Sequence, residues 1–374
     1  MKRVSYIFPI SHHFRYPFHV RLREVLAADN IDYRVVYSAP FGSNVDKRDT
    51  VDVPWGHKVP LLQIGGALLQ WAPGHLAQSD LVVVQQENRL LLNYFAQALD
   101  VLGLRKVAFF GHGRNFQAAD QNSASERWKR FWATKAHWWF AYTEETKKYL
   151  LGLGYPAERV TVFNNAVDTS ELKALSATVT EAELQELRTS LGLVGRHVGV
   201  YVGGLYAEKR LPFLLASLDI IRARVPDFEF VVVGGGPEQA QMEAATTTRP
   251  WLKVTGPQFG KRKVQLMALG DLFLIPGLVG LAILDAGIMG LPVVTTDYPF
   301  HSPEIAYLRD GSNGLMVRPW QDATAYAEEV VALLTSQDGA RLAMSAAARE
   351  IAAGYSIEAM ADRFAEGVRA ALTA

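Results

Sequence analysis

The sequence predicts two Rossmann-like α/β domains, each built around a doubly wound parallel sheet. The length of 374 residues exceeds what one hydrophobic core usually serves, so two domains are expected. Apolar residues make up 49% of the chain and charged residues 20%, a balance typical of packed globular proteins. Short β-branched or aromatic runs alternate with longer stretches of helical periodicity, which is the pattern of βαβ units.

Each half of the chain contains its own series of strand-like runs. In the first half they lie near residues 3–9, 32–37, 80–85, 105–110, 139–142 and 159–163. In the second half they lie near residues 197–203, 228–233, 252–255, 271–275, 291–295 and 313–317. We therefore expect a first domain of residues 1–190 and a second of residues 191–355, with a ligand cleft between them. A helix over 356–374 is expected to pack back on the first domain.

Composition excludes several classes of chemistry. The chain has no cysteine, which rules out thiol nucleophiles, cysteine-bound metals and disulfides and fits a cytoplasmic location. No run reaches the roughly 18 apolar residues that a membrane-spanning helix needs. Residues 1–170 carry 20 Lys/Arg and 15 Asp/Glu, a charge of +5, and the remaining 18 and 23 give −5. The first half is thus the better place for an anionic partner.

Glycine-rich turns follow two strands of the second domain. The first strand ends in Gly203 and Gly204, and Lys209 follows before a helical stretch. The second ends in the turn that contains Gly236. Glycines at the carboxyl end of a strand allow close backbone approach to a ligand, and the lysine ammonium would neutralise a phosphate. The alternative is a tight turn with solvated charges.

A third turn points more directly to an anion. A strand over 271–275 leads into Gly280 and Leu281, where a helix begins. Amides at a helix N-terminus point outward and favour negative charge, so these two are expected to bind a diphosphate. One turn further along, the carboxylate of Asp285 is placed to accept hydrogen bonds from ribose hydroxyls.

These motifs together resemble the retaining GT-B glycosyltransferases of the large family-four-like group, which includes bacterial cell-wall, capsule and O-antigen enzymes. The matching segments occur in order over residues 164–317. They are Asn165 to Asp168, Gly204-Leu205 with Glu208-Lys209, the turn 234–237, Gly280-Leu281 with Asp285, Gly290 to Val294, Pro303-Glu304 and Asp310 to Leu315.

The resemblance implies a GT-B fold and transfer of a sugar from a nucleotide-diphosphate donor to a hydroxyl of a glycan or lipid-linked acceptor, with no metal and no cofactor. Asp285 takes the place of the family's second motif glutamate. Two positions depart from the pattern: Gly277 replaces the first glutamate, and Gly204 replaces an arginine of the phosphate turn. A GT-B-fold nucleotide-sugar epimerase and a catalytically degenerate nucleotide-sugar-binding protein remain alternatives.

The first domain places polar residues where its strands end. His112 lies between two glycines just after the strand 105–110, and the resemblance implies that it faces the donor sugar. A loop histidine bonded to backbone is the alternative. Arg114 is expected to bind an acidic acceptor or the diphosphate, unless it is merely solvated.

Two further strand ends supply candidates for the acceptor site. His12 and His13 follow the first strand, where the family has a glycine-rich loop, so they are expected to shape the acceptor pocket. Glu87 follows the strand 80–85 and is the candidate carboxylate that orients the acceptor. A surface glutamate beside a helix-capping asparagine is the alternative.

Residues 127–139 are rich in both cationic and aromatic side chains. On a helix, Trp128, Phe131, Trp132 and Lys135 share one face, which suits peripheral contact with lipid headgroups at the inner face of a membrane. Packing of that face on the sheet is the alternative. Nucleic-acid binding is not expected, because no wider basic surface accompanies the segment.

Overall fold

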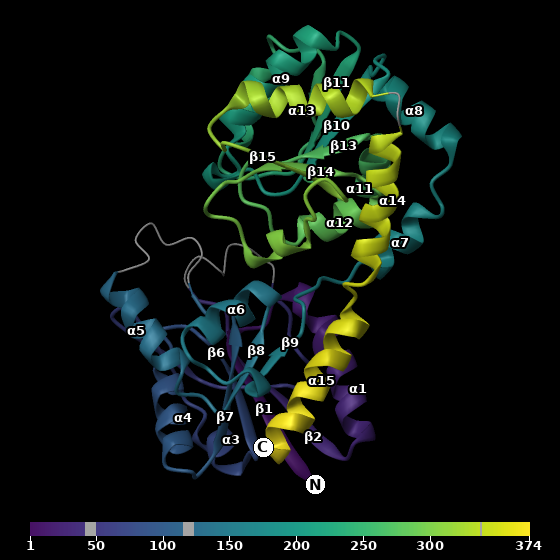
Figure 1. The fold of residues 1–374 in the computed structure, drawn as a ribbon. Helices are drawn as coiled ribbons and strands as arrows, with labels where there is room; N and C mark the ends of the chain where they lie inside the picture. Colours follow the sequence, from purple (N-terminus) through teal and green to yellow (C-terminus); the bar gives the residue numbers. More distant parts are fainter. Residues whose placement is uncertain (42–49, 115–122, 337–338) are drawn as a thin grey trace. The chain divides into compact units, whose positions relative to one another are not determined.

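The computed structural model describes residues 1–41, 50–114, 123–336 and 339–374. It divides into two compact units, one formed by Met1–Asp168 with Ser356–Ala374 and the other by Thr169–Tyr355 (Figure 1). Each unit has its own parallel sheet with helices on it, which confirms the predicted fold class. No helix in the described part of the chain combines the length and apolar character needed to cross a bilayer.

The first unit is built on a seven-stranded sheet of order β3-β2-β1-β6-β7-β8-β9, and neighbouring strands pair in parallel. The strands are β1 (Lys2–Ile10), β2 (Ile31–Ser38), β3 (His57–Lys58), β6 (Leu81–Gln85), β7 (Lys106–Gly111), β8 (Trp138–Ala141) and β9 (Val160–Val162). The helices are α1 (Tyr16–Ala28), α3 (Pro73–Gln78), α4 (Leu91–Val101), α5 (Ala124–Ala133), α6 (Glu144–Gly152) and α15 (Ile357–Thr373). A short antiparallel hairpin of β4 (Leu61–Ile64) and β5 (Ala67–Gln70) joins β3 to α3.

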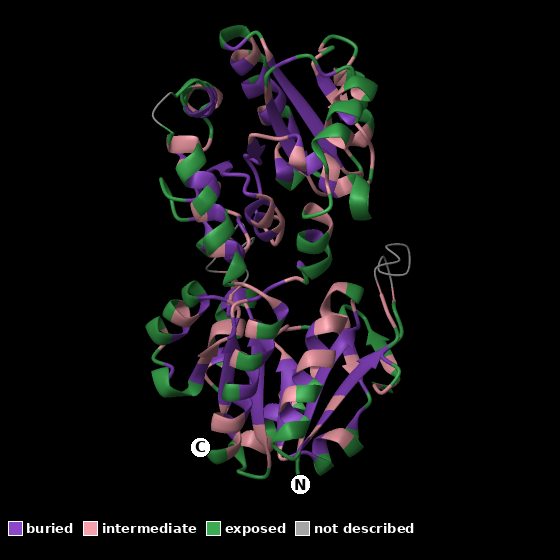
Figure 2. Ribbon diagram, turned by 90° about the vertical axis from the view of Figure 1, so that its right-hand side faces the viewer, coloured by how far each residue is buried: buried purple, intermediate pink, exposed green. Residues whose placement is uncertain are grey.

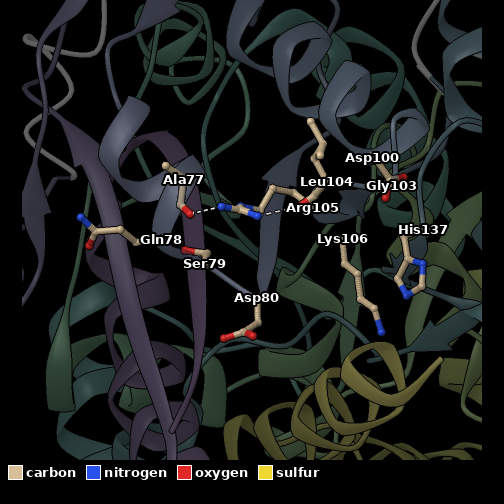
Figure 3. A pocket seen from close by; sticks show the side chains of 10 residues that line it. All are labelled: Ala77, Gln78, Ser79, Asp80, Asp100, Gly103, Leu104, Arg105, Lys106 and His137. Atoms are coloured by element: carbon tan, nitrogen blue, oxygen red, sulfur yellow. Dashed lines mark hydrogen bonds between the residues drawn. The ribbon is translucent and has the colours of Figure 1, made fainter.

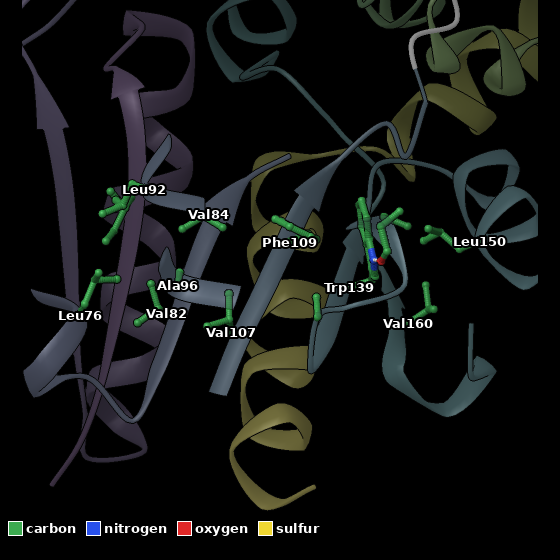
Figure 4. Close-up of a cluster of buried hydrophobic side chains, with 14 of the residues drawn as sticks. Leu76, Val82, Val84, Leu92, Ala96, Val107, Phe109, Trp139, Leu150 and Val160 are labelled. Atoms are coloured by element: carbon green, nitrogen blue, oxygen red, sulfur yellow. Dashed lines mark hydrogen bonds between the residues drawn. The ribbon is translucent and has the colours of Figure 1, made fainter. Parts of the chain in front are cut away.

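Both faces of this sheet are buried, which explains why its strands are apolar without alternation. Successive side chains of β8 point to opposite faces. Trp139 is fully buried and contacts Phe109 in a hydrophobic cluster that extends along this face to side chains of α3, α4 and α6 (Figure 4). On the other face Phe140 stacks on Phe364 of α15 with ring centroids 3.8 Å apart. The second half of the chain therefore contributes an essential wall to the first unit.

The second unit is built on a six-stranded parallel sheet of order β12-β11-β10-β13-β14-β15. The strands are β10 (His197–Val202), β11 (Phe228–Val233), β12 (Leu252–Val254), β13 (Leu272–Leu274), β14 (Val293–Thr296) and β15 (Gly314–Val317). The central strands are buried, whereas β12 and β15 at the edges are partly exposed (Figure 2). The helices are α7 (Ser170–Ser176), α8 (Glu181–Leu191), α9 (Leu211–Arg224), α10 (Gln239–Ala245), α11 (Gly260–Ala268), α12 (Ala282–Met289), α13 (Ala323–Thr335) and α14 (Ala340–Ala353). The order reverses between β10 and β13, which is where doubly wound sheets bind ligands.

The division between the units falls after Asp168, whereas the sequence suggested residue 190. Helices α7 and α8 pack on α11 of the second unit, and Lys261 forms an ion pair with Glu183 on α8 at 2.5 Å. Residues 169–190 therefore belong to the second unit. The division also places Ser356–Ala374, which contains α15, with the first unit.

Candidate functional site

Four side chains gather at the carboxyl edge of the first sheet because parallel strands end on the same side. His112 follows β7, Tyr142 follows β8, Asn165 follows β9 and Arg15 follows β1. The rings of His112 and Tyr142 meet edge to face with centroids 4.2 Å apart. Arg15 donates from Nη1 to Oδ1 of Asn165 over 2.7 Å. The predicted His112 thus lies in a packed polar cluster rather than on a free loop.

His112 is uncharged at physiological pH. Desolvation lowers the pKa of its imidazole to about 3, and the positive charges of Lys129 and Arg15 push this pKa in the same direction. A neutral imidazole has one N–H donor and one acceptor nitrogen. The imidazole of His112 can therefore form hydrogen bonds with a sugar hydroxyl, but it does not supply a positive charge to the site.

Glu87 lies on the turn between β6 and α4 and is about one-quarter exposed, with 28% of its side chain accessible. Its carboxylate forms an ion pair with Arg89 on the same turn. The carboxylate also raises the pKa of Lys129, although burial dominates and leaves that pKa lowered. Lys129 therefore lies close enough to both Glu87 and His112 for its charge to interact with each of them.

The candidate acceptor residues lie on two loops of the same sheet edge. His12 is bridged to Thr50 and stacks on Phe14 with centroids 5.5 Å apart, while His13 is exposed. Arg114 lies over the ring of Tyr149, with its Cζ 5.5 Å from the centroid. None of these contacts identifies a ligand, so their role in acceptor binding stays a prediction.

The glycines of the first two phosphate turns are required by the packing of the turns on each other. A Cβ on Gly236 would lie 2.4 Å from the carbonyl oxygen of Leu205, and one on Gly234 would lie 1.8 Å from that of Gly203. At position 204 a Cβ would meet the ring of Tyr206 at 2.2 Å. Gly203 and Gly236 also have φ of +154° and +152°, which only glycine adopts easily. Close backbone packing, rather than approach to a ligand, accounts for Gly234 and Gly236, and the backbone conformation accounts for Gly203.

Lys209 is turned inward. The residue exposes 5% of its surface, and its Nζ donates to the carbonyl oxygen of Leu278 over 2.5 Å. Burial lowers the pKa of the ammonium to about 8, although the Glu208 charge opposes this. The turn after β10 is therefore bound to the turn after β13, and the lysine charge is held beside the latter.

Gly277 packs against the backbone of Glu208 and Lys209. A Cβ at position 277 would lie 2.3 Å from the carbonyl oxygen of Glu208, so no larger side chain fits. The amide of Leu278 donates to the same oxygen over 2.8 Å. The backbone of the preceding turn thus occupies the space that a side chain at position 277 would need, which gives a physical reason for the departure from the family pattern.

The third turn leaves its helix amides open. His301 accepts at Nδ1 from the amide of Val279 over 3.0 Å, and Ser302 donates its amide to the carbonyl of Val279 over 3.1 Å. The other ring nitrogen of His301 lies 2.8 Å from the carbonyl oxygen of Thr296, so Nε2 carries the proton. Val279 is thus held on both sides. The amides of Gly280, Leu281 and Ala282, which follow it, have no hydrogen-bond acceptor among the described residues.

These open amides have the geometry expected of an anion-binding element. They lie at the N-terminus of α12, where the helix dipole adds partial positive charge. A Cβ at Gly280 would meet no atom nearer than Ser302 Oγ at 3.8 Å, so the space beside the amides is open. In contrast to the other two turns, this glycine is not required by internal packing. The turn is both rigid and accessible.

Asp285, one turn into α12, forms an ion pair with Lys263 of α11 at 2.6 Å through Oδ2. Its Oδ1 has no donor among the described residues, so it can still accept from a ribose hydroxyl. Sequence reasoning did not foresee this pairing. It also missed Tyr142 and His301, whose only sequence signal is their place just beyond a strand.

A pocket of about 510 Å³ lies elsewhere in the first unit, at the amino ends of β6 and β7 (Figure 3). Its charged groups are already bound within the protein. Lys106 donates to the carbonyl oxygen of Leu372 over 2.9 Å. A ring nitrogen of His137 lies 2.9 Å from the carbonyl oxygen of Ala371. This edge of the sheet therefore anchors the end of α15, and it is opposite the edge that carries His112.

Two such parallel-sheet units, one of them with an open turn at a helix N-terminus, fit the GT-B fold of glycosyltransferases. The matches to known families agree with this class. Residues 18–171 match the family described as Glycosyltransferase Family 4, and residues 196–336 match Glycosyl transferases group 1. The chain therefore belongs to the family-four-like glycosyltransferases.

Individual relatives cover less of the chain. The alpha-D-kanosaminyltransferase of Streptomyces kanamyceticus is 29% identical over 192 residues, 50% of this chain and 49% of the relative. The phosphatidyl-myo-inositol mannosyltransferase of Mycolicibacterium smegmatis is 31% identical over 137 residues, 35% of this chain and 34% of the relative. The matched region thus spans half or less of these relatives. The crystal structure of Anabaena HepE in complex with UDP has a TM-score of 0.70 at 16% identity, covering 99% of this chain and 100% of HepE.

Proposed function

We propose that this protein transfers a glycosyl group, with retention of configuration, from a nucleotide-diphosphate sugar to a hydroxyl of a glycan or lipid-linked acceptor. The observation that carries the proposal is the turn before α12, with its amides of Gly280, Leu281 and Ala282 open and Lys209 held beside it. Such a turn stabilises a leaving diphosphate through fixed dipoles and one positive charge. The relatives that act as glycosyltransferases support the reaction class.

The proposed step needs no metal and no protein nucleophile. The acceptor oxygen bonds to the anomeric carbon on the same face from which the diphosphate departs. The acceptor proton passes to a diphosphate oxygen as the bond between the anomeric carbon and the diphosphate breaks. In this proposal the neutral His112 hydrogen-bonds the donor sugar, Glu87 orients the acceptor, and His12, His13 and Arg114 line the acceptor pocket.

The donor is held by the second unit. Gly203, Gly204 and Gly236 shape the turns, and Oδ1 of Asp285 accepts from the ribose. HepE was crystallised with UDP, which makes UDP the first probe for the base of the donor. Calorimetry with a panel of nucleoside diphosphates and nucleotide sugars tests this half of the proposal. Absence of binding by every member of the panel would refute it.

Product analysis separates transfer from the alternatives. Incubation of a bound nucleotide sugar with no acceptor leaves it unchanged if the protein is a transferase, apart from slow hydrolysis. Conversion to an epimeric nucleotide sugar would instead identify an epimerase. Binding without turnover toward any glycan or lipid-linked acceptor would identify a degenerate nucleotide-sugar-binding protein.

We also propose peripheral membrane contact at the cytoplasmic face through the exposed side chains of residues 127–139, which excludes Trp138 and Trp139 because both are buried in β8. Trp128 and Phe131 on α5 are 49% and 56% exposed, so this face does not pack on the sheet. Exposed aromatic rings among lysines and arginines favour an anionic lipid surface. Co-sedimentation with vesicles containing phosphatidylglycerol is expected for the wild type and reduced for a Trp128→Ser, Phe131→Ser variant. Equal sedimentation of both proteins would remove this contact.

A further inference from the structure

Arg210 adopts a backbone conformation that is unfavourable for its type. Its φ and ψ are 57° and 46°, the left-handed region, at the junction between the Lys209 turn and α9. A residue with a Cβ costs about 1 kcal/mol or more in this region, where glycine is the usual choice. An arginine kept there despite the strain is a candidate for a function of its side chain.

The guanidinium of Arg210 is held by aromatic rings. Its Cζ lies 4.1 Å from the ring centroid of Phe213, 4.6 Å from that of Trp320 and 5.5 Å from that of Tyr298. Nη1 donates weakly to the carbonyl oxygen of Pro276 over 3.2 Å and to Oγ1 of Thr296 over 3.3 Å. Among the described residues, Nε and Nη2 have no acceptor, so part of the planar fork remains open to a ligand.

The fork lies beside the same turn that carries the open amides. Arg210 bonds to the carbonyl of Pro276, and Lys209 bonds to that of Leu278. The charges of both cations contribute to the lowered pKa of His301, which holds Val279 of the turn, although burial is the main cause. Two consecutive cations therefore converge on one turn.

Other cations of this sheet edge are neutralised. Lys263 is paired with Asp285 at 2.6 Å, and Arg318 with Asp310 at 2.9 Å. Arg210 has no carboxylate within ion-pair distance in the described part of the chain. Position 204 is a glycine and supplies no cation to this site.

We propose that Arg210 binds a phosphate of the donor diphosphate as a second cation beside Lys209. The proposal rests on the proposed function, because it assigns a residue to the same donor site. A departing diphosphate gains negative charge, and a guanidinium fork matches phosphate oxygens better than a point charge does. The aromatic rings keep the fork oriented before the donor arrives.

The test uses the full chain, with UDP and inorganic pyrophosphate as probes in calorimetry. Arg210→Gly removes the guanidinium, and because the relief of backbone strain offsets part of the lost aromatic contacts, the variant is expected to fold and to melt close to the wild-type temperature. Its affinity for both probes is expected to fall roughly 10- to 100-fold, the loss typical of a hydrogen bond to a charged group. Arg210→Lys, which keeps a charge without the fork, is expected to lose less.

Thr296→Val is the matched control for an indirect effect. It removes the hydroxyl that binds both Arg210 and the carbonyl of Pro276, but it leaves the guanidinium in place. Near wild-type affinity in this variant, with a clear loss in Arg210→Gly, supports direct binding. An equal loss in both variants, or wild-type affinity in Arg210→Gly, overturns the proposal for Arg210. Failure of the wild type to bind either probe would instead refute the proposed function itself.

Discussion

Lys209 and Leu278 are joined by a hydrogen bond of 2.5 Å between the lysine ammonium and the leucine carbonyl oxygen. The amide of the same leucine donates to the carbonyl oxygen of Glu208 over 2.8 Å. The two turns that follow β10 and β13 therefore form one rigid element. Rigidity matters here because donors that are fixed in advance lose little free energy to reorganisation when the diphosphate leaves.

The pKa of Lys209 predicts how donor affinity changes with pH. The ammonium is charged below its pKa of about 8 and neutral above it, and an anion binds the charged form more tightly. UDP affinity is therefore expected to fall about tenfold between pH 7 and pH 9.5. Calorimetry over this range is the measurement. A Lys209→Met variant is the control for the titration of UDP itself, whose uracil ring loses its N3 proton toward the alkaline end of the range. The variant should bind weakly with a shallower dependence, and an equally steep decline in it would contradict the assignment.

Two neighbouring glycines are predicted to respond differently to alanine. In Gly277→Ala the new Cβ would lie 2.3 Å from a backbone oxygen, so the variant should lose about 1–3 kcal/mol of unfolding free energy. In Gly280→Ala the new Cβ meets nothing within 3.7 Å, since Ser302 Oγ is 3.8 Å away, and stability should stay near that of the wild type. UDP affinity should nevertheless fall in Gly280→Ala, because the methyl group occupies the space beside the open amides.

Urea unfolding and UDP calorimetry on both variants check this pair. The contrast is informative because each variant adds the same methyl group to the same turn. A stable Gly277→Ala protein would show that the contact with Glu208 is not tight in solution. Full UDP affinity in Gly280→Ala would place the donor elsewhere.

His112 is predicted to act as a neutral group. Since its pKa is about 3, its protonation does not change between pH 5 and pH 8. The titration of this residue should therefore cause no change of kcat with pH in that range. His112→Gln is expected to lower kcat roughly 100-fold with little change in the donor KM, as loss of a transition-state hydrogen bond would do. Initial-rate kinetics with a donor and acceptor pair provide both values. A large rise in donor KM with unchanged kcat would mean that His112 only helps ground-state binding.

His19 predicts a loss of stability in acid. It is fully buried on α1, its Nδ1 lies 2.8 Å from the hydroxyl of Tyr33, and burial lowers its pKa to about 3. Below the unfolded pKa of about 6.5, the unfolded chain takes up a proton that the folded chain refuses, so stability declines as pH falls toward 3. Between pH 7 and pH 5 this residue alone should remove about 2 kcal/mol.

His19→Asn is the comparison, because asparagine keeps an acceptor for Tyr33 and cannot ionise. The variant should be less stable at pH 7 but lose less on acidification, as measured by urea unfolding at both pH values. Its remaining decline reflects other histidines with lowered pKa, such as His112 and His301. Identical declines in variant and wild type would show that His19 is not buried as a neutral ring.

The sequence predicted the strands well because a sheet buried on both faces leaves continuous apolar runs. The predicted run 139–142 is an example, and it overlaps β8, which spans Trp138–Ala141. Strand β3 and the hairpin of β4 and β5 were missed, since Leu62 and Ile64 are 53% and 57% exposed and their pattern does not reflect a buried face. The boundary at 190 also differed, because the packing of α7 and α8 on α11 is a long-range contact.

Site residues were harder to predict than elements. The turn at Gly280 was expected from a strand, a glycine loop and a helix start, which are local signals. The inward direction of Lys209 and the pairing of Asp285 with Lys263 depend on residues more than 20 positions away. Likewise, the glycines at 234 and 236 serve contacts between two turns, which a single sequence does not distinguish from contacts with a ligand.

The wall that α15 adds to the first sheet has a consequence for biosynthesis. Phe364 packs against Phe140, Phe163, Phe18 and Tyr6, so this face of the sheet is covered by a helix that the ribosome makes after the entire second unit. The nascent amino-terminal half must wait with an uncovered aromatic surface while the second unit folds as an insertion. That interval is when the polypeptide is most exposed to aggregation and to capture by chaperones.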